Sequence, residues 1–217
     1  MSVQTVRFPA AGAEPPVLEG ELWTPDRDVS VPGVVVAHPH PQRGGSMQSN
    51  VVMALCEGLH VAGIASLRFN FRGVGGSEGE YDDGVGERQD VLGALAYLAE
   101  QPGIAAGSMG LAGYSFGARV SQAVASEAPH VRALLSVAPP LREPVSVPCP
   151  FVVLVGDLDQ NLAEGAERYG SYLPDPGRLQ VVHGTDHFWR GFESVLVDAA
   201  QRFFAEVLAA PPAKAAP

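Results

Sequence analysis

The sequence predicts an α/β protein built on a mostly parallel, twisted sheet of about eight strands, with helices on both faces. From residue 33 onward, short apolar segments alternate with longer amphipathic ones. Such alternation is typical of parallel strands joined through helices by right-handed crossovers. Segments such as 33–37 and 151–156 are also apolar without interruption, which suits strands covered on both faces.

The elements follow from local patterns along the chain. Residues 3–8 and 17–23 mix polar and apolar side chains around a Gly- and Pro-rich turn, which predicts an edge hairpin with one wet face. The other expected strands are 33–37, 65–71, the apolar segment from Met109 into Gly113, 131–138, 151–156 and 179–182. The expected helices are about 48–62, 84–100, 116–127, 162–173 and 189–209.

Length and composition indicate one domain. The 217 residues, 46% of them hydrophobic, suffice to bury a sizeable core. We expect a single domain over residues 1–210 and a loose tail over 211–217, because the Ala- and Pro-rich end cannot hold a helix. The oligomeric state does not follow from the sequence.

Charge and cysteine content exclude several function classes. The formal net charge of −10 repels phosphate backbones, so neither nucleic acid nor an anionic membrane is an expected partner. The sequence has neither a signal peptide nor a run of about 18 apolar residues, so we expect a cytoplasmic protein. Cys56 and Cys149 are not spaced as metal ligands, and we expect neither a metal nor another cofactor.

A candidate nucleophile lies in the sequence Gly113-Tyr114-Ser115-Phe116-Gly117. A strand that enters Gly-x-Ser-x-Gly and continues into a helix forms a sharp turn that exposes the serine hydroxyl above the sheet. The first backbone N–H of the following helix, that of Phe116, can then stabilise an oxyanion. The pattern alone also fits a turn whose serine merely caps a helix.

A serine nucleophile needs a histidine base, and the histidine needs an acid to orient it. His183 and His187 both follow the last predicted strand. Asp157 and Asp159 both follow the strand that ends at Gly156. We favour Asp159 as the acid, because it lies further into its loop, and we read Asp157 and Asp186 as local loop residues.

Together these residues resemble the α/β-hydrolase superfamily, and more narrowly its small, lidless bacterial serine hydrolases related to dienelactone hydrolase and the carboxylesterases. Five stretches, in order along nearly the whole chain, carry the resemblance: residues 38–45, 68–75, 113–117, 156–159 and 184–188. The resemblance implies the α/β-hydrolase fold and the order Ser115, Asp159, His187, with His187 as the base. It also implies a second oxyanion donor in the loop after residue 37. Since prolines have no N–H, this donor is His40 or Gln42, and we favour His40.

Two further segments narrow the function. Gly73-Val74-Gly75 begins like a dinucleotide fingerprint, but Glu78 occupies the third glycine position, so we do not expect nucleotide binding. We expect Arg68 and Arg72 to form structural ion pairs. Residues 139–148 are too short for a helical lid, which predicts an open site able to accept a bulky ester.

The expected function is therefore hydrolysis of carboxylic esters of small molecules through an acyl-enzyme. Dienelactone hydrolase has a cysteine nucleophile where this chain has Ser115, which favours ordinary ester hydrolysis. A thioesterase, a peptidase or an acyltransferase could use the same residues. A non-catalytic binding protein would instead have one of the three residues missing or misplaced.

Overall fold

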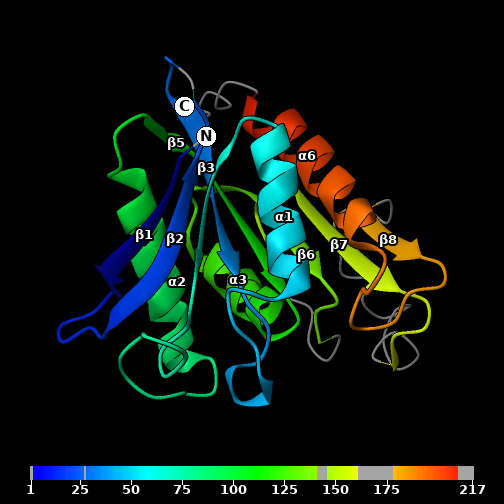
Figure 1. The fold of residues 1–217 in the computed structure, drawn as a ribbon, viewed down its shortest axis with the longest axis horizontal. Coiled ribbons are helices and arrows are strands. Elements are labelled where there is room, and N and C mark those ends of the chain that lie inside the picture. The colour runs from blue at the N-terminus through cyan, green and yellow to red at the C-terminus, as the bar shows by residue number, and fades with distance from the viewer. Residues whose placement is uncertain (1, 27, 141–145, 161–177, 210–217) are drawn as a thin grey trace.

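The computed structural model describes residues 2–26, 28–140, 146–160 and 178–209. Its centre is one sheet in the order β1-β2-β4-β3-β5-β6-β7-β8 (Figure 1). The strands are β1 (Ser2–Pro9), β2 (Val17–Thr24), β3 (Val31–Ala37), β4 (Ala65–Phe69), β5 (Ile104–Tyr114), β6 (Val131–Val137), β7 (Phe151–Gly156) and β8 (Leu179–Val182). β2 pairs antiparallel with both β1 and β4, and all other pairs are parallel, which confirms the predicted sheet.

Helices cover both faces of the sheet, as predicted (Figure 1). They are α1 (Asn50–Val61), α2 (Val85–Ala99), α3 (Phe116–Glu127) and α6 (Glu193–Ala209), together with the short 3-10 helix η1 (Pro41–Arg43). α1 and α6 pack on one face and α2 and α3 on the other, each pair over its own cluster of buried apolar side chains. The predicted helix 162–173 and the predicted tail 211–217 lie outside the described residues.

Several element boundaries differ from the sequence prediction, and three of the differences have a clear local description. The last helix begins at Glu193 rather than near 189, because Trp189 (φ 59°) and Gly191 (φ 80°) have left-handed backbone conformations. β5 begins at Ile104, ahead of the predicted apolar segment. β4 ends at Phe69, two residues early, because the N–H of Phe71 turns away from the sheet to the ring of His38.

Two ion pairs hold β4 and the loop after it to neighbouring elements. Arg68 Nη2 lies 2.7 Å from a carboxylate oxygen of Glu21 in β2, and Arg72 Nη2 lies 2.7 Å from one of Asp90 in α2. Both arginines therefore take part in structural ion pairs, as expected. The loop that follows β4 is fixed against the sheet and α2.

Candidate active site

The turn between β5 and α3 places Ser115 at the carboxyl edge of the sheet. β5 ends at Tyr114 and α3 begins at Phe116, so Ser115 alone makes the turn, with φ 52° and ψ −114°. This conformation is costly for a residue with a side chain and is typical of functional sites. A Cβ on Gly113 would lie 2.5 Å from the carbonyl oxygen of Gly117, so the turn requires a glycine there.

His187 joins Ser115 to Asp159. Its Nε2 lies 3.1 Å from Ser115 Oγ, and its Nδ1 lies 2.7 Å from Asp159 Oδ2. Asp159 is buried, with 4% of its surface exposed. An ionised carboxylate can only accept, so Nδ1 carries the proton and Nε2 is free to accept from the serine hydroxyl.

The other candidate histidine and acids lie in separate interactions. His183 Nδ1 is 2.9 Å from Asp157 Oδ2, and the His183 side chain is 88% exposed. Asp157 also accepts from the Gly184 N–H at 2.7 Å, and its hydrogen bond with His183 lowers its pKa. Asp186 accepts from the N–H of Phe188 at 2.9 Å. Asp157 and Asp186 thus organise their loops, and the structure brings His187 with Asp159, not His183, to Ser115.

Two side chains that the sequence did not single out hold the loop of His187. The hydroxyl of Tyr114 donates to the His187 carbonyl oxygen at 2.8 Å. Burial raises the pKa of Tyr114 to about 12, so this hydroxyl keeps its proton. Asn50 Nδ2, from the start of α1, donates to the Phe188 carbonyl oxygen at 3.1 Å. The signal for Tyr114 was its position inside the glycine-serine motif.

The two candidate second oxyanion donors differ in availability. The N–H of Gln42 donates to Nδ1 of the His40 ring at 3.2 Å, whereas the N–H of His40 donates to no other described residue. The N–H of Phe116 is the first of α3 and has no partner within the helix. Of the three candidate donors, His40 and Phe116 are therefore the ones whose N–H groups are left without a partner among the described residues.

A chain of hydrogen bonds fixes the His40 ring. The hydroxyl of Tyr81 donates to Asp83 Oδ1 at 3.0 Å and lies 3.3 Å from His40 Nε2. Since that hydroxyl proton is used by Asp83, Nε2–H donates to the Tyr81 oxygen and Nδ1 accepts from Gln42. Burial, with the nearby charges of Arg43 and Arg119, lowers the pKa of His40, which favours this neutral form.

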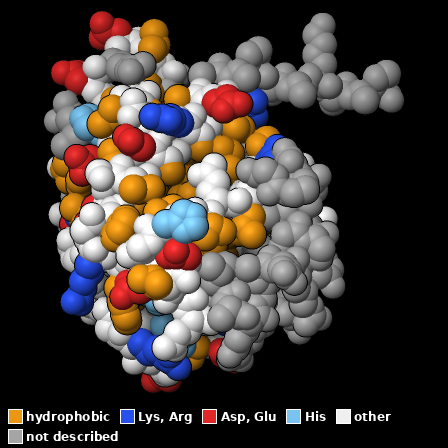
Figure 2. Space-filling view, turned by 90° about the vertical axis from the view of Figure 1, so that its right-hand side faces the viewer, with side chains coloured by type: hydrophobic (Ala, Val, Ile, Leu, Met, Phe, Trp, Pro, Cys, Tyr) orange, Lys and Arg blue, Asp and Glu red, His pale blue; other side chains and the backbone are white. Residues whose placement is uncertain are grey.

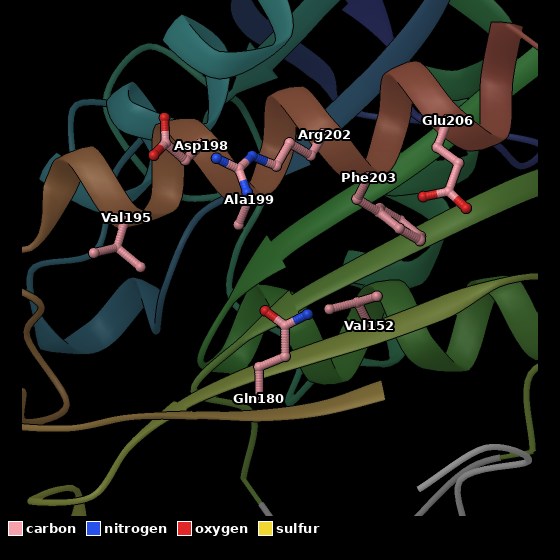
Figure 3. A pocket seen from close by; sticks show the side chains of 8 residues that line it. All are labelled: Val152, Gln180, Val195, Asp198, Ala199, Arg202, Phe203 and Glu206. Carbon is pink, nitrogen blue, oxygen red and sulfur yellow. The ribbon is translucent and has the colours of Figure 1, made fainter. Parts of the chain in front are cut away.

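A cavity of about 420 Å³ lies elsewhere, between α6 and strands β7 and β8 (Figure 3). Val152 and Gln180 line its floor, while Phe203 and Glu206 reach into it from α6. The same side of the molecule, seen in Figure 2, mixes hydrophobic with acidic and basic side chains. None of the lining residues belongs to the Ser115 site. In the part of the chain that the structure describes, no cluster of three or more His, Cys, Asp or Glu could hold a metal ion.

The sheet order, with a serine on the turn after β5, defines the α/β-hydrolase class, and solved structures of that class match nearly the whole chain. An alpha-beta serine hydrolase homologue from Coxiella burnetii is 32% identical, with a TM-score of 0.80 over 91% of this chain and 96% of that one. A protein of Xanthomonas campestris, described as an a/b serine hydrolase without lid, is 30% identical, with a TM-score of 0.81 over 97% of both chains.

Sequence comparison agrees with the structural match. An uncharacterized protein of Rickettsia prowazekii (strain Madrid E) is 32% identical over 177 residues, which are 74% of this chain and 73% of that protein. The family model for X-Pro dipeptidyl-peptidase (S15 family) matches residues 16–147. The chain therefore belongs to the S15 family within the α/β-hydrolase superfamily, and it is a hydrolase. The predicted superfamily and fold class are confirmed.

Proposed function

We propose that this protein is a serine hydrolase that cleaves carboxylic esters of small molecules through an acyl-enzyme. The observation that carries the proposal is the continuous chain from Ser115 Oγ to His187 Nε2, at 3.1 Å, and from His187 Nδ1 to Asp159 Oδ2, at 2.7 Å. A binding protein of the same fold would not need these three side chains aligned. The distances thus favour an enzyme over a non-catalytic relative.

In the proposed reaction, Ser115 Oγ attacks the ester carbonyl carbon while His187 Nε2 takes the hydroxyl proton. The carbonyl oxygen becomes an oxyanion, which accepts from the N–H groups of Phe116 and His40. The bond to the alcohol then breaks, and His187 returns its proton to the departing alkoxide. A water molecule repeats these steps on the acyl-enzyme and releases the carboxylic acid.

The other proposed properties follow from the sequence and the open site. We propose one domain over residues 1–210, a cytoplasmic location and no requirement for a cofactor. The described helices include none that is both long and apolar enough to span a membrane. The substrate can be bulky, because no lid domain is expected over Ser115.

A substrate panel with the Ser115→Ala variant tests this function. We expect the wild type to hydrolyse p-nitrophenyl esters, and Ser115→Ala to lose roughly 10⁴-fold or more in kcat/KM. A fluorophosphonate probe is expected to label the wild type at Ser115 and to leave the variant unlabelled. Ester hydrolysis or labelling that survives in Ser115→Ala would contradict the assignment.

A peptidase is the second candidate, favoured by the X-Pro dipeptidyl-peptidase description of the matching family model. Amide cleavage can use the same nucleophile, base and oxyanion donors. The panel therefore includes Xaa-Pro p-nitroanilides, together with acyl-CoA thioesters and an added alcohol as acyl acceptor. A higher kcat/KM for the p-nitroanilides than for the esters would replace the esterase proposal with a peptidase.

A further inference from the structure

His38 makes two opposite hydrogen bonds inside the protein. It follows β3, is fully buried, and its Nε2 accepts from the N–H of Phe71 at 3.0 Å. Since a backbone N–H can only donate, Nε2 carries no proton and Nδ1 carries one. The Nδ1–H therefore donates to the Pro39 carbonyl oxygen, 2.6 Å away.

That carbonyl belongs to the same peptide unit as the N–H of His40. A trans peptide is planar, with its C=O and N–H pointing in opposite directions, and no described peptide bond is cis. Holding the Pro39 oxygen toward the buried ring of His38 therefore aims the His40 N–H away from that ring. The orientation of one donor is set by a contact on the other side of its peptide.

Neighbouring backbone prevents this peptide from rotating. A Cβ on Gly45 would collide with the Pro39 and His40 carbonyl oxygens, so the Gly45 backbone lies directly against them. The His40 carbonyl oxygen, in the next peptide, accepts from the N–H groups of Arg43 at 3.0 Å and Gly45 at 3.1 Å. The peptide units on both sides of the His40 Cα are thus fixed. Of these contacts, those from Arg43 and Gly45 are made by backbone, and that from His38 is made by a side chain.

We propose that His38 is a positioning residue of the oxyanion hole, which sets the direction of the His40 N–H by holding the Pro39 carbonyl oxygen. The proposal rests on the proposed esterase function. His38 has no part in proton transfer to the substrate, and it acts on the transition state only through His40. The strand end at Ala37 and the segment at Phe71 together support the ring that does this.

Two substitutions separate the two hydrogen bonds of His38. In His38→Asn, the side-chain N–H₂ can replace Nδ1 and hold the Pro39 oxygen, while the bond to Phe71 is lost. In His38→Gln, the side-chain oxygen can replace Nε2 and accept from Phe71, while the bond to Pro39 is lost. Both variants lose one buried hydrogen bond, so melting temperatures should fall by similar amounts. Val34→Ala, at a fully buried position of β3, serves as a control for general loss of stability.

We expect His38→Gln to lose about tenfold to a hundredfold in kcat for a p-nitrophenyl ester, with little change in KM, since oxyanion donors act mainly in the transition state. His38→Asn should recover most of that loss, and Val34→Ala should keep the wild-type kcat. A trifluoromethyl ketone, which forms an oxyanion on Ser115, should bind His38→Gln more weakly by the same factor.

Two results would overturn the proposal. One is equal kcat for His38→Gln and His38→Asn, and the other is a loss in His38→Gln that appears in KM alone. If the wild type cleaves no ester of the panel, or if Ser115→Ala remains active, the proposed esterase function itself is wrong. Ser115-dependent hydrolysis that is intact in His38→Gln removes only the role of His38.

Discussion

The imidazole of His187 lies between a hydroxyl and a carboxylate, and each neighbour fixes one of its nitrogens. The position of His187 in the sequence could not separate it from His183, because both follow β8 at the same edge. The loop path separates them: Tyr114 holds the His187 backbone beneath the turn of Ser115, while His183 extends into solvent beside Asp157. The contact between Tyr114 and His187 joins residues 73 apart in the sequence, so no local sequence pattern encodes it.

The two aspartates after β7 give a matched test of the acid. Asp159→Asn should lower kcat by about 10⁴-fold, since an amide at this place favours the wrong histidine tautomer. Asp157→Asn removes a carboxylate of the same loop that contacts His183 instead, and should keep nearly the wild-type kcat. Kinetics on one p-nitrophenyl ester checks both, and equal losses would remove Asp159 from its proposed role.

The buried ring of His38 predicts a pH-dependent stability. Burial lowers the pKa of His38 from 6.5 to about 4, so below pH 6.5 the unfolded chain binds a proton that the folded chain does not. Its contribution to stability is present above pH 6.5 and falls by about 1.4 kcal/mol per pH unit as the pH drops toward 4.

His38→Asn has no group that titrates in this range. The wild type should therefore lose up to about 3 kcal/mol of unfolding free energy relative to His38→Asn between pH 6.5 and 4. Urea titrations of both proteins across this range measure the difference. Parallel pH profiles would mean that the folded ring takes up its proton at the same pH as the unfolded one.

At the scale of elements, strands with a strong apolar signal were predicted well and irregular ends were not. β7 and β8 have the predicted bounds, and in β7 an uninterrupted apolar segment leaves few alternatives. Within β5, Ala105 to Ser108 lack that signal and lie at an irregularity, where the pairing with β3 passes from Ile104 directly to Met109. Trp189 and Gly191 have left-handed conformations that delay the start of α6, and the side chain of Trp189 is fully buried.

The contact between α3 and β3 gives a prediction at this scale. A Cβ on Gly117 would collide with the carbonyl oxygens of Ala37 and His38, so Gly117→Ala must push α3 away from β3. We expect a loss of about 1–3 kcal/mol in unfolding free energy, as for overpacked cores, with reduced ester hydrolysis. Gly107→Ala is the control: a Cβ there meets nothing within 4 Å, and its effect should stay within about 0.5 kcal/mol. Similar melting temperatures for the two variants would contradict this close approach.

At the scale of the whole molecule, the fold followed from the sequence because alternating apolar strands and helices admit few topologies. The hydrogen bonds that distinguish the N–H of His40 from that of Gln42 did not follow from the sequence. They depend on the orientation of the His40 ring, which is set by Tyr81, 41 residues further along the chain. The net charge of the chain is a second property at this scale, and we expect it to affect which esters the protein hydrolyses fastest.

A net charge of −10 should disfavour anionic esters at low ionic strength. We expect kcat/KM for a p-nitrophenyl ester with a carboxylate on its acyl chain to rise roughly severalfold between about 10 mM and 500 mM salt. The matched neutral ester should show no such rise. Faster hydrolysis of the anionic ester at low salt would show that a local cation, not the overall charge, governs selection.

The exposed pair of His183 and Asp157 has a practical consequence for chemical modification. With 88% of its side chain exposed, His183 is far more accessible than His187, at 27%. An imidazole-directed acylating reagent will therefore consume His183 before His187, and its early stoichiometry will include a residue that makes no contact with Ser115. Inactivation should lag behind the first equivalent of modified histidine, so a count of modified residues at partial inactivation would assign the base to the wrong ring.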